Sequence, residues 1–290
     1  MSEMATSEMV VTPLSDAMGA EVTGIDAATM IDADFERLRD ALHEHIMLAV
    51  RDQALDPASQ TAFARRFGEI QYHINSEYKM KDQPEVLILS TEVVDGKNIG
   101  IPDAGSDWHS DHSYVDRPTA YTILQSVIVP EHGGDTEWTN MVKAYETLPQ
   151  EVKTRIKGLI GIHSFNRARN PRWSRVSRHQ DPDAYYNRVS PPDAFHPIVR
   201  THPATGRKAL FISPRFTIGI KDMDDAQAQP LLDALFAHID NRDFVYHHKW
   251  RPGDLVMWDN RQTLHLACGG VTPPEVRRMH RSTVLGEIPV

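Results

Sequence analysis

Two side chains that can bind a metal, His109 and Asp111, stand two residues apart in the segment Trp108-His109-Ser110-Asp111. On a β-strand, residues i and i+2 point to the same side, so we expect both to reach one ion. A third ligand must come from elsewhere, and His265 follows the apolar segment Leu255–Trp258. Two imidazoles and a carboxylate leave half of an octahedral coordination sphere open, as in non-haem Fe(II) oxygenases. The sequence therefore predicts a catalytic Fe²⁺ bound by His109, Asp111 and His265, with O₂ as the oxidant.

This spacing has alternative interpretations. A His-X-Asp triplet also occurs in polar turns that bind no metal. His112 directly follows Asp111 and could replace His109 as a ligand, but on a strand it would face the opposite side. We interpret His112 as a residue that faces the substrate.

A second constellation could bind an anion. A chelating co-substrate such as 2-oxoglutarate needs a cation for its far carboxylate, and a bidentate arginine is the strongest partner. Arg277, Arg278 and Arg281 follow His265, and Arg281 begins the strand-like segment Arg281–Leu285. A strand that returns from the third ligand would bring such an arginine beside the metal, although a solvated surface would also account for all three.

A tight turn precedes the strand-like pair Glu137-Trp138. It consists of Gly133-Gly134-Asp135-Thr136, and its glycines permit positive φ angles. The Thr136 hydroxyl could assist carboxylate binding. The alternative is a plain hairpin turn.

The composition limits the class of protein. The chain has 290 residues, 40% of them hydrophobic and 24% charged, with a formal net charge of −9. These values are ordinary for a globular protein, and the negative charge argues against a general nucleic-acid binder. No apolar run reaches the roughly 20 residues of a membrane helix. Cys268 is the single cysteine, which fits a cytoplasmic location. We interpret it as a small apolar filler.

The organisation of the chain is simple. Residues 1–9 are small, polar and Met-rich, and we expect them to form a disordered tail without the apolar core of a signal peptide. No repeat or linker divides the remainder, so residues 10–290 are predicted to form one domain.

Hydrophobic spacing predicts a mainly β fold with flanking helices. Helices are expected from Phe35 to Ile46, from Pro57 to Gly68, over Asn140–Lys157 with a kink near Pro149, and over Asp224–Ile239. Strands are expected at Ile46–Val50, Pro84–Ser90, Tyr121–Val129, Phe195–Val199, Ala209–Ile212, Phe244–His247, Leu255–Trp258, Thr263–Ala267 and Arg281–Leu285. Many short strands with few helices indicate a β-sandwich or jelly roll.

Seven collinear segments resemble the TauD/TfdA family of Fe(II)- and 2-oxoglutarate-dependent dioxygenases. They are Thr12-Pro13-Leu14 with Gly19-Ala20, residues 63–68, 108–111 and 133–136, residues 200–203 with 206–208, residues 258–261 with His265, and residues 277–281. The resemblance extends from about residue 11 to residue 287. It implies a double-stranded β-helix core, which is a cupin-like jelly roll.

The resemblance also implies roles for individual residues. It implies that iron is bound by His109, Asp111 and His265. For 2-oxoglutarate it implies contacts from Thr136 and Arg281, with Arg277 near the other carboxylate.

For the substrate, the resemblance implies a binding histidine at His73 and a pocket phenylalanine at Phe216. The residues that hold the taurine amine in taurine dioxygenase are replaced here by Ala104, Gly105 and Ser76. Taurine is therefore not the expected substrate.

A basic segment, Arg167–Arg178, contains five arginines and no acid. A cationic loop over the site would attract anions, although an exposed or subunit-contact loop is an equal alternative. Trp173, Phe165 and Phe216 could form an apolar wall. We therefore expect a small organic anion as substrate, and a homo-oligomer such as a dimer or tetramer by analogy with relatives.

Together these features predict a dioxygenase that hydroxylates a sulfonate, a sulfate ester, an aryloxyalkanoate or a similar carboxylate, with cleavage of a carbon–heteroatom bond. A zinc-type hydrolase could use the same three ligands, but it gives no reason for Thr136 and Arg281 to accompany them. A non-catalytic metabolite-binding protein is a further alternative, and the intact ligand set argues against it.

Overall fold

A large sheet forms the centre of the computed structural model, which describes residues 8–73, 76–102, 105–166 and 191–290. This sheet has seven strands in the order β1-β2-β3-β15-β7-β17-β4. Their bounds are Val10–Pro13, Ala20–Thr23, Met47–Val50, Leu255–Asp259, Thr119–Ile128, Arg278–Leu285 and Leu87–Ser90. All pairings are antiparallel except β2 with β3.

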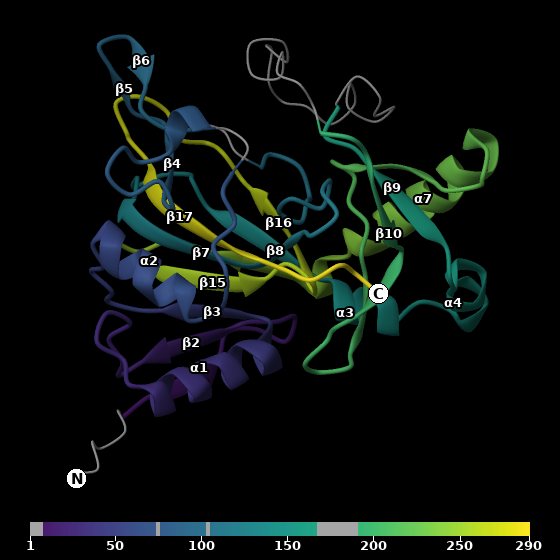
Figure 1. Ribbon diagram of the computed structural model, residues 1–290, viewed down its shortest axis with the longest axis horizontal. Coiled ribbons are helices and arrows are strands. Elements are labelled where there is room, and N and C mark those ends of the chain that lie inside the picture. Colours follow the sequence, from purple (N-terminus) through teal and green to yellow (C-terminus); the bar gives the residue numbers. More distant parts are fainter. Residues whose placement is uncertain (1–7, 74–75, 103–104, 167–190) are drawn as a thin grey trace.

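The two faces of the large sheet have different roles. Helices α1 (Asp32–His45) and α2 (Pro57–Arg65) cover the outer face (Figure 1). There Leu38, Leu42 and Phe63 join one hydrophobic cluster with Leu48 and Ile123. Directly paired residues of antiparallel strands point to the same face. Alternate residues of β7, β15 and β17 therefore point inward, toward the interior of the roll.

A smaller sheet faces that interior. Its order is β14-β8-β16, with bounds Val245–His248, Thr136–Asn140 and Thr263–Ala267. The two sheets meet through aromatic side chains, since the rings of Trp138 on β8 and Trp258 on β15 lie 5.3 Å apart in an edge-to-face arrangement. A second hydrophobic cluster, which includes both tryptophans, fills the space between the sheets.

The remaining elements lie around these sheets. A third sheet has the order β10-β9-β13, and β11 pairs with β12, as β5 does with β6. The strands are β5 (Val93–Val94), β6 (Lys97–Asn98), β9 (Ile160–His163), β10 (Ala194–Pro197), β11 (Val199–Thr201), β12 (Lys208–Leu210) and β13 (Thr217–Ile220). The helices are α3 (Met141–Glu146), α4 (Gln150–Ile156), α7 (Asp225–Ile239) and the 3₁₀ turns η1 (Ser76–Tyr78) and η3 (Arg242–Phe244). Figure 1 shows α4 and α7 beside β9, at the end of the molecule opposite α2.

The predicted fold class, a mainly β jelly roll with flanking helices, is confirmed. The prediction of one kinked helix over Asn140–Lys157 is wrong, because α3 ends at Glu146 and α4 begins at Gln150. Pro149 causes the break, since the residue before a proline is pushed out of the helical region. Pro149 itself has ψ of 144° and precedes the first turn of α4.

Other boundaries also differ from the predictions. The expected strand Phe195–Val199 is divided into β10 and β11, and β1, β2, β5, β6, β9 and β13 were not predicted. Within the described residues, no helix is long and apolar enough to span a bilayer.

The outer face of the small sheet carries an ionic group centred on His247. Its ring nitrogens lie 2.8 Å from Asp135 and 3.1 Å from Glu137. Burial lowers the pKa of His247, but the hydrogen bonds to the two carboxylates outweigh burial and raise the pKa above its usual value. A raised folded-state pKa contributes stability that is complete below the unfolded-state pKa of about 6.5.

We therefore predict that His247→Gln lowers the free energy of unfolding at pH 6 by less than about 1 kcal/mol, because solvent screens this half-exposed group. The difference from wild type should shrink as the pH rises through the folded-state pKa. Urea unfolding at pH 6 and pH 9 measures it. A difference that grows with pH would contradict the prediction.

Candidate metal centre

The backbone of His109 pairs directly with that of His265. The two residues form an antiparallel bridge, with N–H to C=O distances of 3.1 Å and 2.8 Å. Paired residues point to the same face, and the two imidazole rings lie 4.0 Å apart. The short segment before Asp111 therefore acts as an extra strand on the edge of the small sheet, and this pairing joins two residues far apart in the sequence.

Asp111 completes the cluster from a turn, so the prediction that His109 and Asp111 share a regular strand is wrong. The Nε2 atom of His109 and that of His265 each lie 3.9 Å from a different oxygen of the Asp111 carboxylate. All three ligand atoms lie within 4.8 Å of one another. The structure thus brings together the three residues that the sequence singled out.

The large sheet fixes the Asp111 carboxylate from its inner face. Thr122 on β7 donates a hydrogen bond of 2.7 Å to one oxygen, and Arg281 on β17 donates one of 3.2 Å to the other. Asn260 accepts from the backbone N–H of Asp111 at 3.1 Å and donates to Thr122 at 2.8 Å. Trp258 also donates to the Asn260 oxygen, at 3.2 Å. These bonds leave the carboxylate little freedom to turn.

The protonation states suit a metal. Burial lowers the pKa of His109, and it lowers that of His265 to about 4, so both rings are neutral. Burial alone would raise the pKa of Asp111, but the positive charge of Arg281 opposes burial and the pKa is lowered. Neutral imidazole and ionised carboxylate are the forms that bind metal ions.

The tautomer of His109 also fits a metal ligand. Its Nδ1 lies 2.8 Å from the carbonyl oxygen of Asp107, which can only accept, so Nδ1 carries the proton and Nε2 presents its lone pair toward Asp111. A backbone acceptor behind a ligating imidazole is a common support of metal sites. The buried Nδ1 of His265 has no hydrogen-bond partner among the described residues. Two imidazoles and a carboxylate suit Fe(II).

A second group of side chains that could bind a metal contains the half-buried His43 and the buried His202 and Asp259, and it is built differently. Arg261 donates to both oxygens of Asp259 at 2.8 Å and 2.7 Å, and His202 contacts the same carboxylate at 2.9 Å. Its charge is already neutralised by an arginine, so we interpret this group as structural.

Thr136 and Arg277 lie around a common tryptophan. Trp250 donates to the Thr136 hydroxyl at 3.0 Å, and the Arg277 guanidinium lies over the Trp250 ring at 5.8 Å. Arg277 also donates to the carbonyl of Gly134 at 2.9 Å. Burial lowers the pKa of Arg277 to about 10, and within the described residues no carboxylate lies within 4.0 Å of it. A partly buried guanidinium without an acidic partner is a candidate anion site.

Thr136 lies on the same face of the small sheet as the metal-ligand candidate His265. Thr136 pairs with Ala267, as Trp138 does with His265, and these four residues point to one face. The resemblance implied that Thr136 and Arg281 contact 2-oxoglutarate, with Arg277 near its other carboxylate. In the structure Thr136 lies near Arg277 around Trp250, and Arg281 lies on the opposite sheet beside Asp111.

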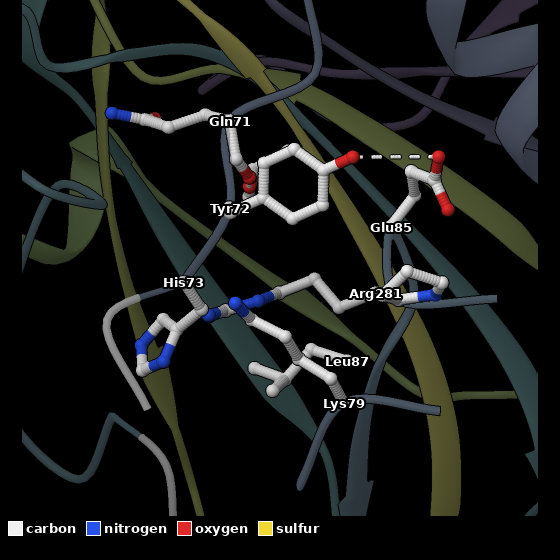
Figure 2. A pocket seen from close by; sticks show the side chains of 9 residues that line it. Gln71, Tyr72, His73, Lys79, Glu85, Leu87 and Arg281 are labelled. Carbon is white, nitrogen blue, oxygen red and sulfur yellow. Dashed lines mark hydrogen bonds between the residues drawn. The ribbon is translucent and has the colours of Figure 1, made fainter. Parts of the chain in front are cut away.

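Arg281 also lines a pocket with His73 (Figure 2). The other lining residues are Gln71, Tyr72, Lys79, Pro84, Glu85, Leu87 and Thr283. Burial lowers the pKa of His73, and the charge of Arg281 lowers it further, so the ring is neutral. Because Arg281 reaches Asp111, this pocket adjoins the metal centre.

Hydrogen bonds determine the tautomer of His112. The amide nitrogen of Gln71 donates to the carbonyl of Arg117 at 3.1 Å, so its oxygen faces the Thr119 hydroxyl and accepts from it. Thr119 must then accept from Nδ1 of His112, at 2.8 Å. Nε2 of His112 is therefore an unprotonated acceptor, and it is buried without a partner among the described residues.

Aromatic rings border the metal centre on another side. Phe216 lies edge-on to His109 with centroids 6.0 Å apart, and Tyr114 lies 4.9 Å from Phe216 and 4.7 Å from Phe165. The predicted wall residues Phe165 and Phe216 thus lie together. Three other expectations concern Arg167–Arg178, Trp173 and Ala104, all of which lie outside the described residues.

Sequence reasoning missed several residues of this site. Thr122 and Tyr114 carry no motif that distinguishes them from core residues, and Asn260 lies in the family-like segment 258–261 but no role was predicted for it. Gly105 was noted only as a departure from the taurine enzyme. It has φ of +84°, and a Cβ there would lie 2.5 Å from Cε1 of His109. Only glycine fits against that ring. The glycine itself was visible in the sequence, but its reason could not be found without the fold.

Comparison with known proteins shows the family of this chain. A family model described as "Taurine catabolism dioxygenase TauD, TfdA family" matches residues 11–283. The chain is 34% identical over 275 residues to the alpha-ketoglutarate-dependent 2,4-dichlorophenoxyacetate dioxygenase of Cupriavidus pinatubonensis, covering 89% of this chain and 91% of that protein. It is 31% identical over 294 residues to the alpha-ketoglutarate-dependent sulfate ester dioxygenase of Pseudomonas putida, covering 98% and 91%. The structure of a taurine dioxygenase from Burkholderia xenovorans has a TM-score of 0.80 and 30% identity, covering 97% and 91%.

The chain therefore belongs to the TauD/TfdA family of alpha-ketoglutarate-dependent dioxygenases. It is an enzyme that uses Fe(II), 2-oxoglutarate (alpha-ketoglutarate) and O₂ on a small organic substrate. The zinc-type hydrolase and the non-catalytic binding protein are set aside.

We predict that Gly105→Ala weakens metal binding about 10- to 100-fold, the range for loss of a residue that supports a ligand. The added Cβ would displace the His109 ring. Gly96→Ala is the matched control, since Gly96 has φ of +75° and nothing within 4 Å of its Cβ position. Anaerobic Fe(II) titration of both variants provides the test, and equal affinities would contradict the prediction.

Proposed function

We propose that His109 and His265 bind the ferrous ion through Nε2 and that Asp111 binds it through its carboxylate. The supporting observation is that both Nε2 atoms face the same buried carboxylate. When bound, iron with 2-oxoglutarate and O₂ supplies an oxidant that inserts oxygen into a C–H bond. The protein's own contribution is orientation: Asn260 and Thr122 hold Asp111, and the Asp107 carbonyl holds His109.

For 2-oxoglutarate we propose a different division of roles from the one that the resemblance implied. Thr136 and Arg277 share Trp250 and lie on the side of the small sheet. They would hold the far carboxylate, because Arg277 is partly buried and has no carboxylate partner among the described residues. Arg281 would then hold the Asp111 carboxylate and bind the substrate.

For the substrate we propose a small organic anion whose charged head lies between Arg281 and His73. His112 would accept a hydrogen bond from the substrate through its bare Nε2. Phe165 and Phe216 would contact the apolar part. Named substrates of two relatives, a dichlorophenoxyacetate and a sulfate ester, fit an anionic head with an organic tail. Hydroxylation of a carbon that bears oxygen or sulfur would give an unstable product, which breaks that carbon–heteroatom bond as the new hydroxyl becomes a carbonyl and its proton passes to the leaving heteroatom.

The replacement of His265 by alanine tests the metal assignment. We predict that His265→Ala loses the visible charge-transfer absorption of the anaerobic Fe(II)–2-oxoglutarate complex. Succinate formation should fall about 100-fold or more. His132→Ala removes an exposed histidine and should leave both signals unchanged. A variant at residue 265 with wild-type oxygen consumption would refute the assignment.

Two arginine variants separate the co-substrate from the substrate. We predict that Arg277→Gln raises the dissociation constant of 2-oxoglutarate about 30-fold, because truncating a buried charge pair costs about 2 kcal/mol or more. Arg281→Gln should retain 2-oxoglutarate binding and raise KM for the organic substrate. The charge-transfer titration gives the first constant and a succinate assay gives the second. If Arg281→Gln instead weakened 2-oxoglutarate binding and Arg277→Gln did not, Thr136 would act with Arg281 on the co-substrate, and the proposed division of roles would be wrong.

A further inference from the structure

Lys79 belongs to the same pocket as Arg281 by virtue of strand register. It forms an antiparallel bridge with Leu87, and Leu87 pairs with Arg281. Direct partners point to the same face, so Lys79, Leu87 and Arg281 form one row across three adjacent segments. All three line the pocket, and Figure 2 shows the Lys79 and Arg281 side chains reaching toward the same end of it, beside His73.

The positive charge of Lys79 is not neutralised within the described residues. No carboxylate there lies within 4.0 Å of its ammonium group, which lies over the Tyr72 ring, 5.2 Å from the ring centroid. Glu85 lines the same pocket but is bonded to Arg65 at 2.7 Å and to Gln83 at 2.9 Å. Asp111 contacts Arg281 and is also the carboxylate that would face the metal.

Two cations that converge on one pocket repel each other unless an anion lies between them. Both also lower the pKa of His73, in addition to burial, so the ring remains a neutral hydrogen-bonding group there. A head group with a single negative charge would satisfy Arg281 and leave Lys79 without a partner. A head group with two negative charges would match both.

We propose that Lys79 determines substrate specificity, and that this pocket takes a dianionic phosphoryl head, as in an alkyl phosphate or a phosphonate. The inference rests on the proposed function, because it assumes that the substrate head binds between Arg281 and His73. It adds to the proposed function the charge of the substrate head group and a residue, Lys79, that would select for that charge.

A pair of isosteric probes tests this inference. Methyl phosphate and methyl sulfate have the same shape, but above about pH 6 the phosphate monoester carries a second negative charge. Calorimetric titration of the anaerobic Fe(II)–2-oxoglutarate enzyme at pH 7.5 should give at least 10-fold tighter binding of methyl phosphate. A parallel titration with methylphosphonate distinguishes a phosphonate from a phosphate ester.

Lys79→Gln should remove this preference by weakening methyl phosphate and leaving methyl sulfate unchanged. Lys81→Gln, at an exposed lysine nearby, should retain it. Equal affinity of wild type for the two probes, or a preference that survives in Lys79→Gln, would overturn the proposal. The charge-transfer band is recorded on the same samples: a normal band with no preference refutes only the role of Lys79, whereas an absent band refutes the proposed metal and co-substrate site.

Discussion

The structure depends on keeping one carboxylate, that of Asp111, ionised in the interior of the jelly roll. Burying a charge is costly unless opposite charge and hydrogen bonds compensate for it. Thr122 and Arg281 supply that compensation from the large sheet, and Asn260 holds the Asp111 backbone N–H. A ferrous ion would add positive charge at the same point, so the surroundings that stabilise Asp111 are also those that prepare a metal site.

The two sheets carry different parts of the proposed site. The small sheet carries His265 and Thr136 on one face and gains His109 through a backbone bridge. The large sheet carries the groups that orient Asp111, and it extends through Leu87 toward Lys79. Side chains from segments far apart in the sequence therefore meet in the interior. The rigidity of paired strands is what sets their distances.

Much of the fold and the three-residue cluster could be predicted from sequence, for different reasons. Strands were predicted at Leu255–Trp258 and Thr263–Ala267, and the structure has them at Leu255–Asp259 and Thr263–Ala267. Pro149 acts locally, but whether it kinks a helix or separates two helices depends on packing that the spacing does not reveal. The grouping of Thr136 with Arg277 could not be predicted, because sequence distance does not indicate which sheet a residue faces. Gly105 shows the same limit: its need for glycine arises from His109, which only the folded chain brings near.

The central claim is that His109, Asp111 and His265 hold one ion, and anomalous diffraction tests it most directly. Crystals grown anaerobically with Mn(II) in place of iron and with 2-oxoglutarate would be measured at the manganese edge. The account predicts a single strong peak bonded to Nε2 of both histidines and to the carboxylate of Asp111. A peak bound instead at His43, His202 and Asp259, or no peak at the predicted position, would contradict it.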